Sequence, residues 1–124
     1  MQWNLSDDRP IYAQIMETIT LAIASGTLPA GSKLPSVREL AAEAGVNPNT
    51  MQRALSELER TGLLYSQRTA GRFVTEEVQH IQSKRKELAM EQIELFLSAM
   101  RGMGYTAQET LDLLQQAVEK EERS

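Results

Sequence analysis

Two predicted helix N-termini, at Ser36 and Asn47, lie close together in this chain, and only a short turn separates the first helix from the second. Ser36 and Glu39 form a capping box, in which the serine caps a helix and the glutamate reaches back to its first amide. Gly45 ends that helix, because glycine readily adopts the left-handed conformation found just past helix ends. Asn47 then caps another helix, with Pro48 in its first turn. Two helices joined by such a turn cross at a steep angle, which predicts a helix-turn-helix.

A longer helix is predicted before this pair of helices, and a hairpin after it. Isoleucines spaced four residues apart form an apolar stripe on a helix of about residues 10–25. The helix after the turn extends to about residue 61, where a glycine follows. Two short strands are predicted at about residues 63–66 and 72–75. This order predicts a mostly α-helical chain with a small β-hairpin, in which residues 1–75 form a winged helix-turn-helix.

The helix after the turn begins with side chains that hydrogen-bond to nucleic-acid bases. In a helix-turn-helix the second helix enters the major groove, with its first residues nearest the bases. Asn49 and Gln52 each offer a carboxamide that bonds adenine through two atoms, and Arg53 can do the same to guanine. Between the two predicted strands, the segment Gln67–Arg72 is polar and basic. Such a tip is typical of a wing that contacts the DNA backbone or the minor groove.

The charge of the chain gives little support to a nucleic-acid partner. The net charge is −4, which alone argues against such a partner. Within residues 1–75 the cationic and acidic side chains balance, so residues 76–124 carry the whole net negative charge. The N-terminal part can therefore face a polyanion while the rest of the chain stays acidic.

Five segments of the N-terminal part form a pattern that is specific in combination. They are Pro10–Ile15, Gly31–Ala41, Val46–Leu55, Leu58–Gly62 and Gly71–Val74. With this pattern, the chain resembles the GntR family of bacterial transcription regulators over residues 10–75. The turn of Asn, Pro, Asn and Thr and the short helical C-terminal part resemble the YtrA branch of that family.

The resemblance implies a sequence-specific DNA-binding regulator, expected to be a repressor that binds a near-palindromic operator as a homodimer. The YtrA branch further implies control of a transporter operon. DNA contacts are expected from the helix starts, the helix after the turn and the wing. These residues are Ser36, Arg38, Asn47, Asn49, Thr50, Gln52, Arg53, Arg68, Thr69, Gly71 and Arg72.

Simpler interpretations of these residues remain open. Arg53 can pair with Glu57 one helical turn away, and capping alone accounts for Asn47. The wing arginines can be ordinary solvated charges. An alternative function is a winged-helix protein-interaction module without specific DNA binding. Two features favour it: the net negative charge of the chain, and Thr69 at a position where the family's wing commonly has glycine. The salt dependence of binding to random duplex DNA separates the two functions.

Residues 76–124 are expected to be a two-helix dimerisation region. A long helix is predicted to about residue 103, and a second capping box at Thr106 and Glu109 opens a last helix. The long helix is apolar on two faces, and both must be buried. One face is expected to take the last helix and the DNA-binding domain, and the other a second copy of the chain. The expected dimer residues are Ile81, Leu88, Leu95 and Ala99.

Nothing in the sequence indicates catalysis. There is no cysteine, His80 is the single histidine, and neither a HExxH nor a GxSxG motif occurs, so no catalytic residue, metal site or cofactor is expected. No stretch is long and apolar enough to span a membrane, and the N-terminus lacks the features of a signal peptide. We therefore expect a cytoplasmic protein. No residue pattern identifies a small-molecule effector, and two C-terminal helices leave little room for its pocket.

Overall fold

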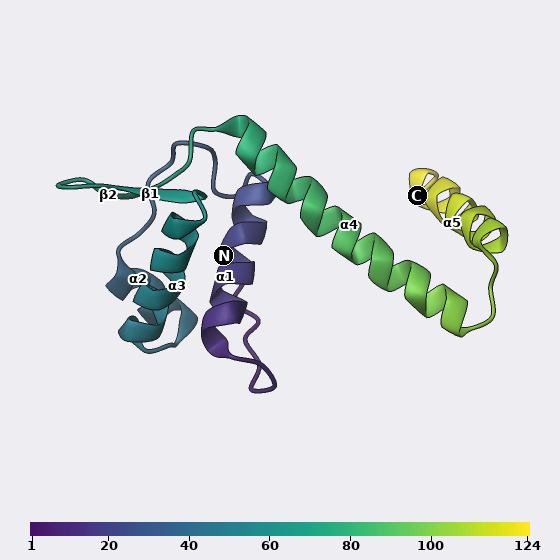
Figure 1. Cartoon of the computed structure of the whole chain (residues 1–124), viewed down its shortest axis with the longest axis horizontal. Coiled ribbons are helices and arrows are strands. Elements are labelled where there is room, and N and C mark those ends of the chain that lie inside the picture. The colour runs from purple at the N-terminus through teal and green to yellow at the C-terminus, as the bar shows by residue number, and fades with distance from the viewer. The chain divides into compact units, whose positions relative to one another are not determined.

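The computed structural model describes residues 1–124, which form two compact units, Met1–Arg85 and Lys86–Ser124. Figure 1 labels the elements, five helices and one hairpin. Their bounds are α1 Ile11–Ala24, α2 Val37–Ala44, α3 Pro48–Arg60, β1 Leu64–Gln67, β2 Gly71–Val74, α4 Val78–Gly102 and α5 Ala107–Glu122. The expected fold class, a mostly helical winged helix-turn-helix followed by two helices, is confirmed.

The turn between α2 and α3 is built from the predicted caps. The backbone N–H of Glu39 donates to the hydroxyl of Ser36, and the Glu39 carboxylate accepts from the Ser36 backbone N–H, which completes the capping box. Gly45 ends α2 in the left-handed conformation, with φ of 71°. At the start of α3, the backbone N–H of Asn49 donates to Oδ1 of Asn47 over 2.7 Å. These local bonds fix the point at which α3 leaves the turn.

A single core places α3 between its neighbours. In Figure 1, α1, α2 and α3 form one cluster, and α3 contacts α1, α2 and β1. Its apolar stripe is fully buried against side chains from α1 and α2. This core includes Ile15, Ile19, Leu40, Met51, Leu55 and Leu58. Because this stripe faces inward, the opposite face of α3 is turned to solvent.

The hairpin is tied to the rest of the unit on one side. Its strands pair antiparallel, from Leu64 opposite Val74 to Gln67 opposite Gly71. The segment before α2 lies along β2, where the backbone N–H of Leu34 donates to the carbonyl oxygen of Arg72 over 2.9 Å. The wing is therefore held at its base, where Leu64 and Val74 are buried, while its outer half is exposed.

The first unit extends past the boundary expected at residue 75, because the first turns of α4 belong to it. Ile81 lies in the core of this unit with only 8% of its surface exposed. His80, half-buried beside it, bonds through Nε2 to the carbonyl oxygen of Thr61 over 3.0 Å. The prediction of Ile81 as a dimer residue therefore needs correction, since its side chain is already covered within its own chain.

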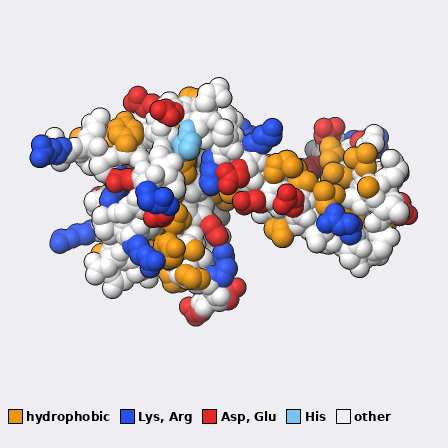
Figure 2. All heavy atoms as spheres, viewed as in Figure 1, with side chains coloured by type: hydrophobic (Ala, Val, Ile, Leu, Met, Phe, Trp, Pro, Cys, Tyr) orange, Lys and Arg blue, Asp and Glu red, His pale blue; other side chains and the backbone are white.

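The second unit leaves most of its apolar side chains uncovered. Thr106 and Glu109 form the predicted capping box of α5. The expectation that α5 covers one face of α4 is wrong, because only Met100 and Thr110 are buried in this unit. Large apolar side chains stay exposed on both helices and in the turn between them, where Met103 lies. Those on the helices are Met90, Ile93, Leu95, Phe96, Leu111, Leu113, Leu114 and Val118. Figure 2 shows hydrophobic side chains gathered over α4 and α5. No helix of the chain has the length and apolar character needed to cross a membrane.

Candidate nucleic-acid interface

The solvent face of α3 carries the predicted base-reading residues. Asn49, Gln52 and Arg53 are exposed, and Thr50 is half-buried. They lie opposite the buried stripe of α3, so the core itself turns them outward. In Figure 2, lysine and arginine side chains lie over the part of the first unit that contains α2, α3 and the hairpin. The face therefore combines hydrogen-bonding side chains with neighbouring positive charge.

Arg53 does not pair with Glu57. Its guanidinium carbon lies 4.0 Å from the ring centroid of Tyr12 on α1, in a cation–π contact. Glu57 instead accepts a hydrogen bond from Nε of Arg60 over 2.8 Å. This bond, opposed by desolvation and helped by the charges of Arg60 and Arg53, lowers the pKa of Glu57. The guanidinium of Arg53 therefore keeps its hydrogen-bond donors free of a carboxylate partner. Local sequence patterns do not single out Tyr12, because its contact joins two separate helices.

The two wing arginines have different surroundings. Arg68 and Thr69 are exposed at the tip of the hairpin, and Arg68 takes part in none of the ion pairs of the structure. Arg38, exposed on α2, is likewise outside those ion pairs. Arg72 is half-buried on β2, with 16% of its side chain exposed, and is paired with Glu59 of α3. Arg38 and Arg68 therefore each present a positive charge that is outside those ion pairs.

Arg72 links the wing to the reading face of α3. Its Nε donates to Oε1 of Glu59 over 2.9 Å, and its Nη1 donates to Oε1 of Gln52 over 3.3 Å. Nε2 of Gln52 donates to the hydroxyl of Ser56 over 3.3 Å. Ser66 on β1 completes the set by donating to the same oxygen of Glu59. We call these five residues the Arg72 network.

The charges of the Arg72 network favour an ionised Glu59. Desolvation alone would raise the pKa of Glu59, but hydrogen bonds from Ser66 and Arg72 and the charge of Arg72 lower it below its usual value. Glu59 is therefore a carboxylate at neutral pH and holds Arg72 as an ion pair. Glu59, Ser56 and Ser66 are not among the residues predicted from the sequence, although Gln52, Ser56 and Glu59 lie on one helical stripe. These residues could not be predicted without knowing that Arg72 of β2 bonds to that stripe.

A groove of about 740 Å³ separates the start of α2 from the hairpin. Lys33, Ser36, Arg68 and Arg72 are among its lining residues, so the fold brings a helix start and the wing together. Gly71 forms part of this lining with φ of 104°, and a Cβ there would lie 3.2 Å from Cε of Lys33. The backbone conformation therefore requires glycine at this position, whereas the flexible end of the Lys33 side chain can move aside.

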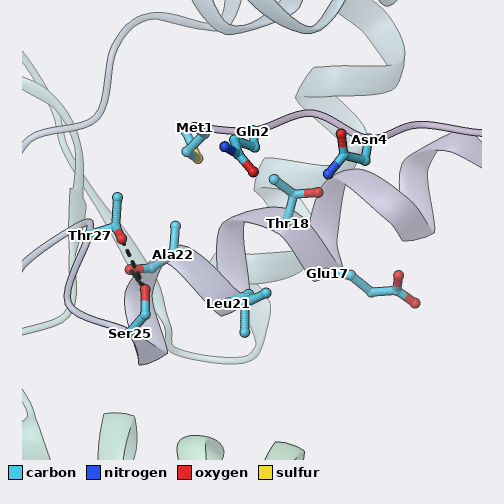
Figure 3. Close-up of a pocket in the computed structure, with 9 residues that line it drawn as sticks. All are labelled: Met1, Gln2, Asn4, Glu17, Thr18, Leu21, Ala22, Ser25 and Thr27. Carbon is cyan, nitrogen blue, oxygen red and sulfur yellow. Dashed lines mark hydrogen bonds between the residues drawn. The ribbon is translucent and has the colours of Figure 1, made fainter. Parts of the chain in front are cut away.

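A second hollow, of about 650 Å³, lies away from the predicted interface (Figure 3). It is lined by α1 and the N-terminal residues, including Asn4, Thr18 and Leu21. Its carboxylate, Glu17, is paired with Arg9 over 2.7 Å. No lysine or arginine lines this hollow, so it lacks the cationic side chains that attract a DNA phosphate. No group of acidic or histidine side chains is placed to hold a metal ion.

The capping bond of Asn47 gives a stability prediction. Asn47→Ala is expected to lower the free energy of unfolding by about 1 kcal/mol, because a first-turn amide of α3 loses its partner. Asn49→Ala is the matched control, since the Asn49 side chain makes no bond in the structure and its loss should leave stability within about 0.5 kcal/mol. Urea denaturation measures both. Equal stability of the two variants would show that Asn47 does not act as a cap.

Comparison with known proteins gives a family match over the first unit. Residues 11–74 match the family described as "Bacterial regulatory proteins, gntR family". The chain is 38% identical to an uncharacterized HTH-type transcriptional regulator, YhcF, of Bacillus subtilis, over 90% of this chain and 93% of that protein. It is 43% identical to the HTH-type transcriptional repressor YtrA of Bacillus subtilis, over 54% of this chain and 52% of that protein.

Two solved structures are also similar. A GntR family transcriptional regulator from Listeria monocytogenes superposes with a TM-score of 0.84 and 38% identity, covering 90% of this chain and 98% of that one. The DNA-binding domain of AraR, solved in complex with operator ORX1, has a TM-score of 0.53 and 37% identity, covering 60% of this chain and 92% of that one. The similarity thus includes a domain whose structure contains operator DNA.

Proposed function

Because this chain belongs to the gntR family of bacterial regulatory proteins, a family of DNA-binding transcriptional regulators rather than enzymes, we propose that it represses transcription by binding a near-palindromic operator as a homodimer. The observation that supports this most is the exposed face of α3, where Asn49, Gln52 and Arg53 stand beside the wing. Family membership argues against the alternative of a winged-helix module without specific DNA binding.

In this proposal, α3 reads bases in the major groove. Asn49 and Gln52 recognise adenine, and Arg53 leaves the ring of Tyr12 to bond guanine through two donors. Thr50 and Asn47 lie at the same helix start and contact the adjoining phosphate or base edge. The face offers donors and acceptors together, which direct readout requires.

Phosphate contacts come from Arg38 and Arg68, which are exposed and outside the ion pairs, and from the residues around them. Arg38 and Ser36 approach the backbone at the start of α2, while Arg68, Thr69 and Gly71 approach it from the wing. Such contacts position the protein on the duplex and add affinity without regard to sequence. The net charge of −4 does not oppose this, because residues 1–75, which supply every proposed DNA contact, carry no net charge.

Arg68→Ala tests the wing contact. It is expected to weaken binding to every duplex by a similar factor and to lower the slope of log K against log salt by about one. Fluorescence anisotropy at several salt concentrations gives this slope. Arg60→Ala is the control, because Arg60 lies at the far end of α3 and pairs with Glu57. A slope equal to that of the wild type would remove Arg68 from the set of phosphate ligands.

The uncovered apolar side chains of α4 and α5 support a homodimer. A single chain leaves both faces of α4 in water, including Ile93, Leu95 and Phe96, and α5 adds Leu111 and Leu114. A contiguous exposed surface of this kind marks an interaction site. A second copy covers it by a two-fold arrangement, which pairs two α3 helices with two operator half-sites. Of the predicted dimer residues, Leu88, Leu95 and Ala99 stay in this proposal.

Repression follows from occupancy of the operator. A dimer seated on a promoter excludes the polymerase, and YtrA of Bacillus subtilis, a relative over the first unit, is described as a repressor. The resemblance to the YtrA branch extends the proposal to a transporter operon. In vitro transcription from a promoter that carries the selected operator tests whether the protein represses or activates. Repression is the expected result, and activation or no effect at full occupancy would contradict it.

A further inference from the structure

The Arg72 network fixes the side chain of a base reader before DNA is present. Gln52 is exposed on α3, where a free glutamine samples many rotamers and both orientations of its amide. In the structure its Oε1 accepts from Arg72, and its Nε2 donates to Ser56. An arginine on one side and a hydroxyl on the other distinguish the two ends of the carboxamide.

The bonds leave Gln52 able to read one base. A carboxamide has two acceptor positions on its oxygen and two donors on its nitrogen. The network uses one of each, so one acceptor and one donor remain. These match the N6 donor and the N7 acceptor of adenine in the major groove.

Arg72 can hold Gln52 because Glu59 holds Arg72. The ion pair occupies Nε of the guanidinium at 2.9 Å, and Nη1 reaches Gln52 at 3.3 Å, so one rigid group bridges both residues. Only 16% of the Arg72 side chain and 28% of the Glu59 side chain are exposed. A cation neutralised and covered in this way is a poor phosphate ligand, in contrast to Arg68 at the exposed tip.

We propose that Arg72 is a positioning residue for specificity: anchored by Glu59, it orients the carboxamide of Gln52 so that one base pair of the operator is read as adenine. This rests on the proposed function of DNA readout by α3. It assigns to Arg72 a role different from the phosphate contact expected from the sequence, and it includes Glu59, which contacts no base, in the specificity machinery.

The first step of the test locates the base pair. Gln52→Ala is compared with the wild type on duplexes that carry single base-pair changes in the selected operator, and the position at which discrimination is lost is the one that Gln52 reads. A wild type that discriminates no sequence would overturn the proposed function itself. Discrimination that Gln52→Ala leaves unchanged at every position would overturn this inference alone.

The second step removes opposite charges from the same network. Arg72→Met and Glu59→Ala are each expected to lower discrimination at that position about five- to tenfold, because both release the carboxamide. Their effects on random duplex DNA should be opposite: weaker binding for Arg72→Met and tighter binding for Glu59→Ala. A phosphate contact can also give opposite effects on affinity, but it carries no sequence information. The loss of discrimination at one position, shared by the two variants, is therefore the result that distinguishes this proposal.

Two further variants complete the design. Arg72→Lys keeps the charge but lacks the rigid planar fork that reaches Glu59 and Gln52 in fixed directions, so it should lose discrimination while keeping the wild-type salt slope. This conservative variant carries the test if Arg72→Met fails to fold by circular dichroism. In the double variant with Gln52→Ala, Arg72→Lys should cost no further discrimination. Full discrimination by Arg72→Lys, or equal weakening of all duplexes by Arg72→Met with a lower salt slope, would overturn the proposal.

Discussion

Leu95→Glu is expected to make the chain monomeric and to weaken operator binding roughly a hundredfold or more, because a bivalent contact becomes monovalent. Leu95 is an apolar side chain with 66% of its surface exposed on α4. In a two-fold interface the change places a carboxylate from each copy in an apolar contact, where an unpaired charge is costly. Sedimentation equilibrium gives the mass, and anisotropy on the full operator gives the affinity.

The matched control is Leu21→Glu, since Leu21 on α1 is similarly exposed at 61% but belongs to the first unit. This variant should stay dimeric and bind the operator like the wild type. A dimeric Leu95→Glu variant with unchanged operator affinity would place the dimer contact elsewhere. Circular dichroism shows whether both variants keep their helical content, which separates a loss of assembly from a loss of folding.

Arg53→Ala is expected to cost about 1–3 kcal/mol of binding free energy on the operator and to relax preference at one position. The guanidinium of Arg53 stacks on Tyr12 and is not tied to an acid, so it is available to bond guanine through two donors. Arg53→Lys should retain the charge and lose the preference, because an ammonium cannot form the two parallel bonds. Competition binding against duplexes changed at single positions measures the preference.

Arg60→Ala serves as the control within the same helix. Arg60 lies at the end of α3 away from the reading residues and is already paired with Glu57, so operator affinity should change by less than about 0.5 kcal/mol. If Arg53→Ala and Arg60→Ala behave alike, Arg53 acts only as a general positive charge. If Arg53→Ala leaves operator affinity unchanged in a folded protein, Arg53 is not a base reader.

The sequence was sufficient to predict the elements whose signals are local. The capping boxes at Ser36 and Thr106, the cap at Asn47 and the left-handed Gly45 each depend on residues within one helical turn, and all appear as expected. The order of these signals predicted the winged helix-turn-helix. The exposed face of α3 followed from the spacing of its apolar residues alone.

Features that depend on tertiary contacts could not be predicted in the same way. The partner of Arg72 is thirteen positions away at Glu59, and Arg53 rests on Tyr12 of another helix. Hydrophobic periodicity marked Ile81 as apolar but could not show that the core of the first unit takes it. The same pattern showed two apolar faces on α4 without showing that α5 leaves both uncovered.

Selection of bound sequences from a pool of random duplex DNA at moderate salt tests the central claim most directly. A dimer that reads DNA through two α3 helices should enrich a near-palindromic motif, with half-sites separated by about one helical turn or a multiple of it. The enriched motif then supplies the operator for every variant described above. A folded, dimeric protein that enriches no motif, and whose weak binding to the pool does not depend on salt, would contradict the account.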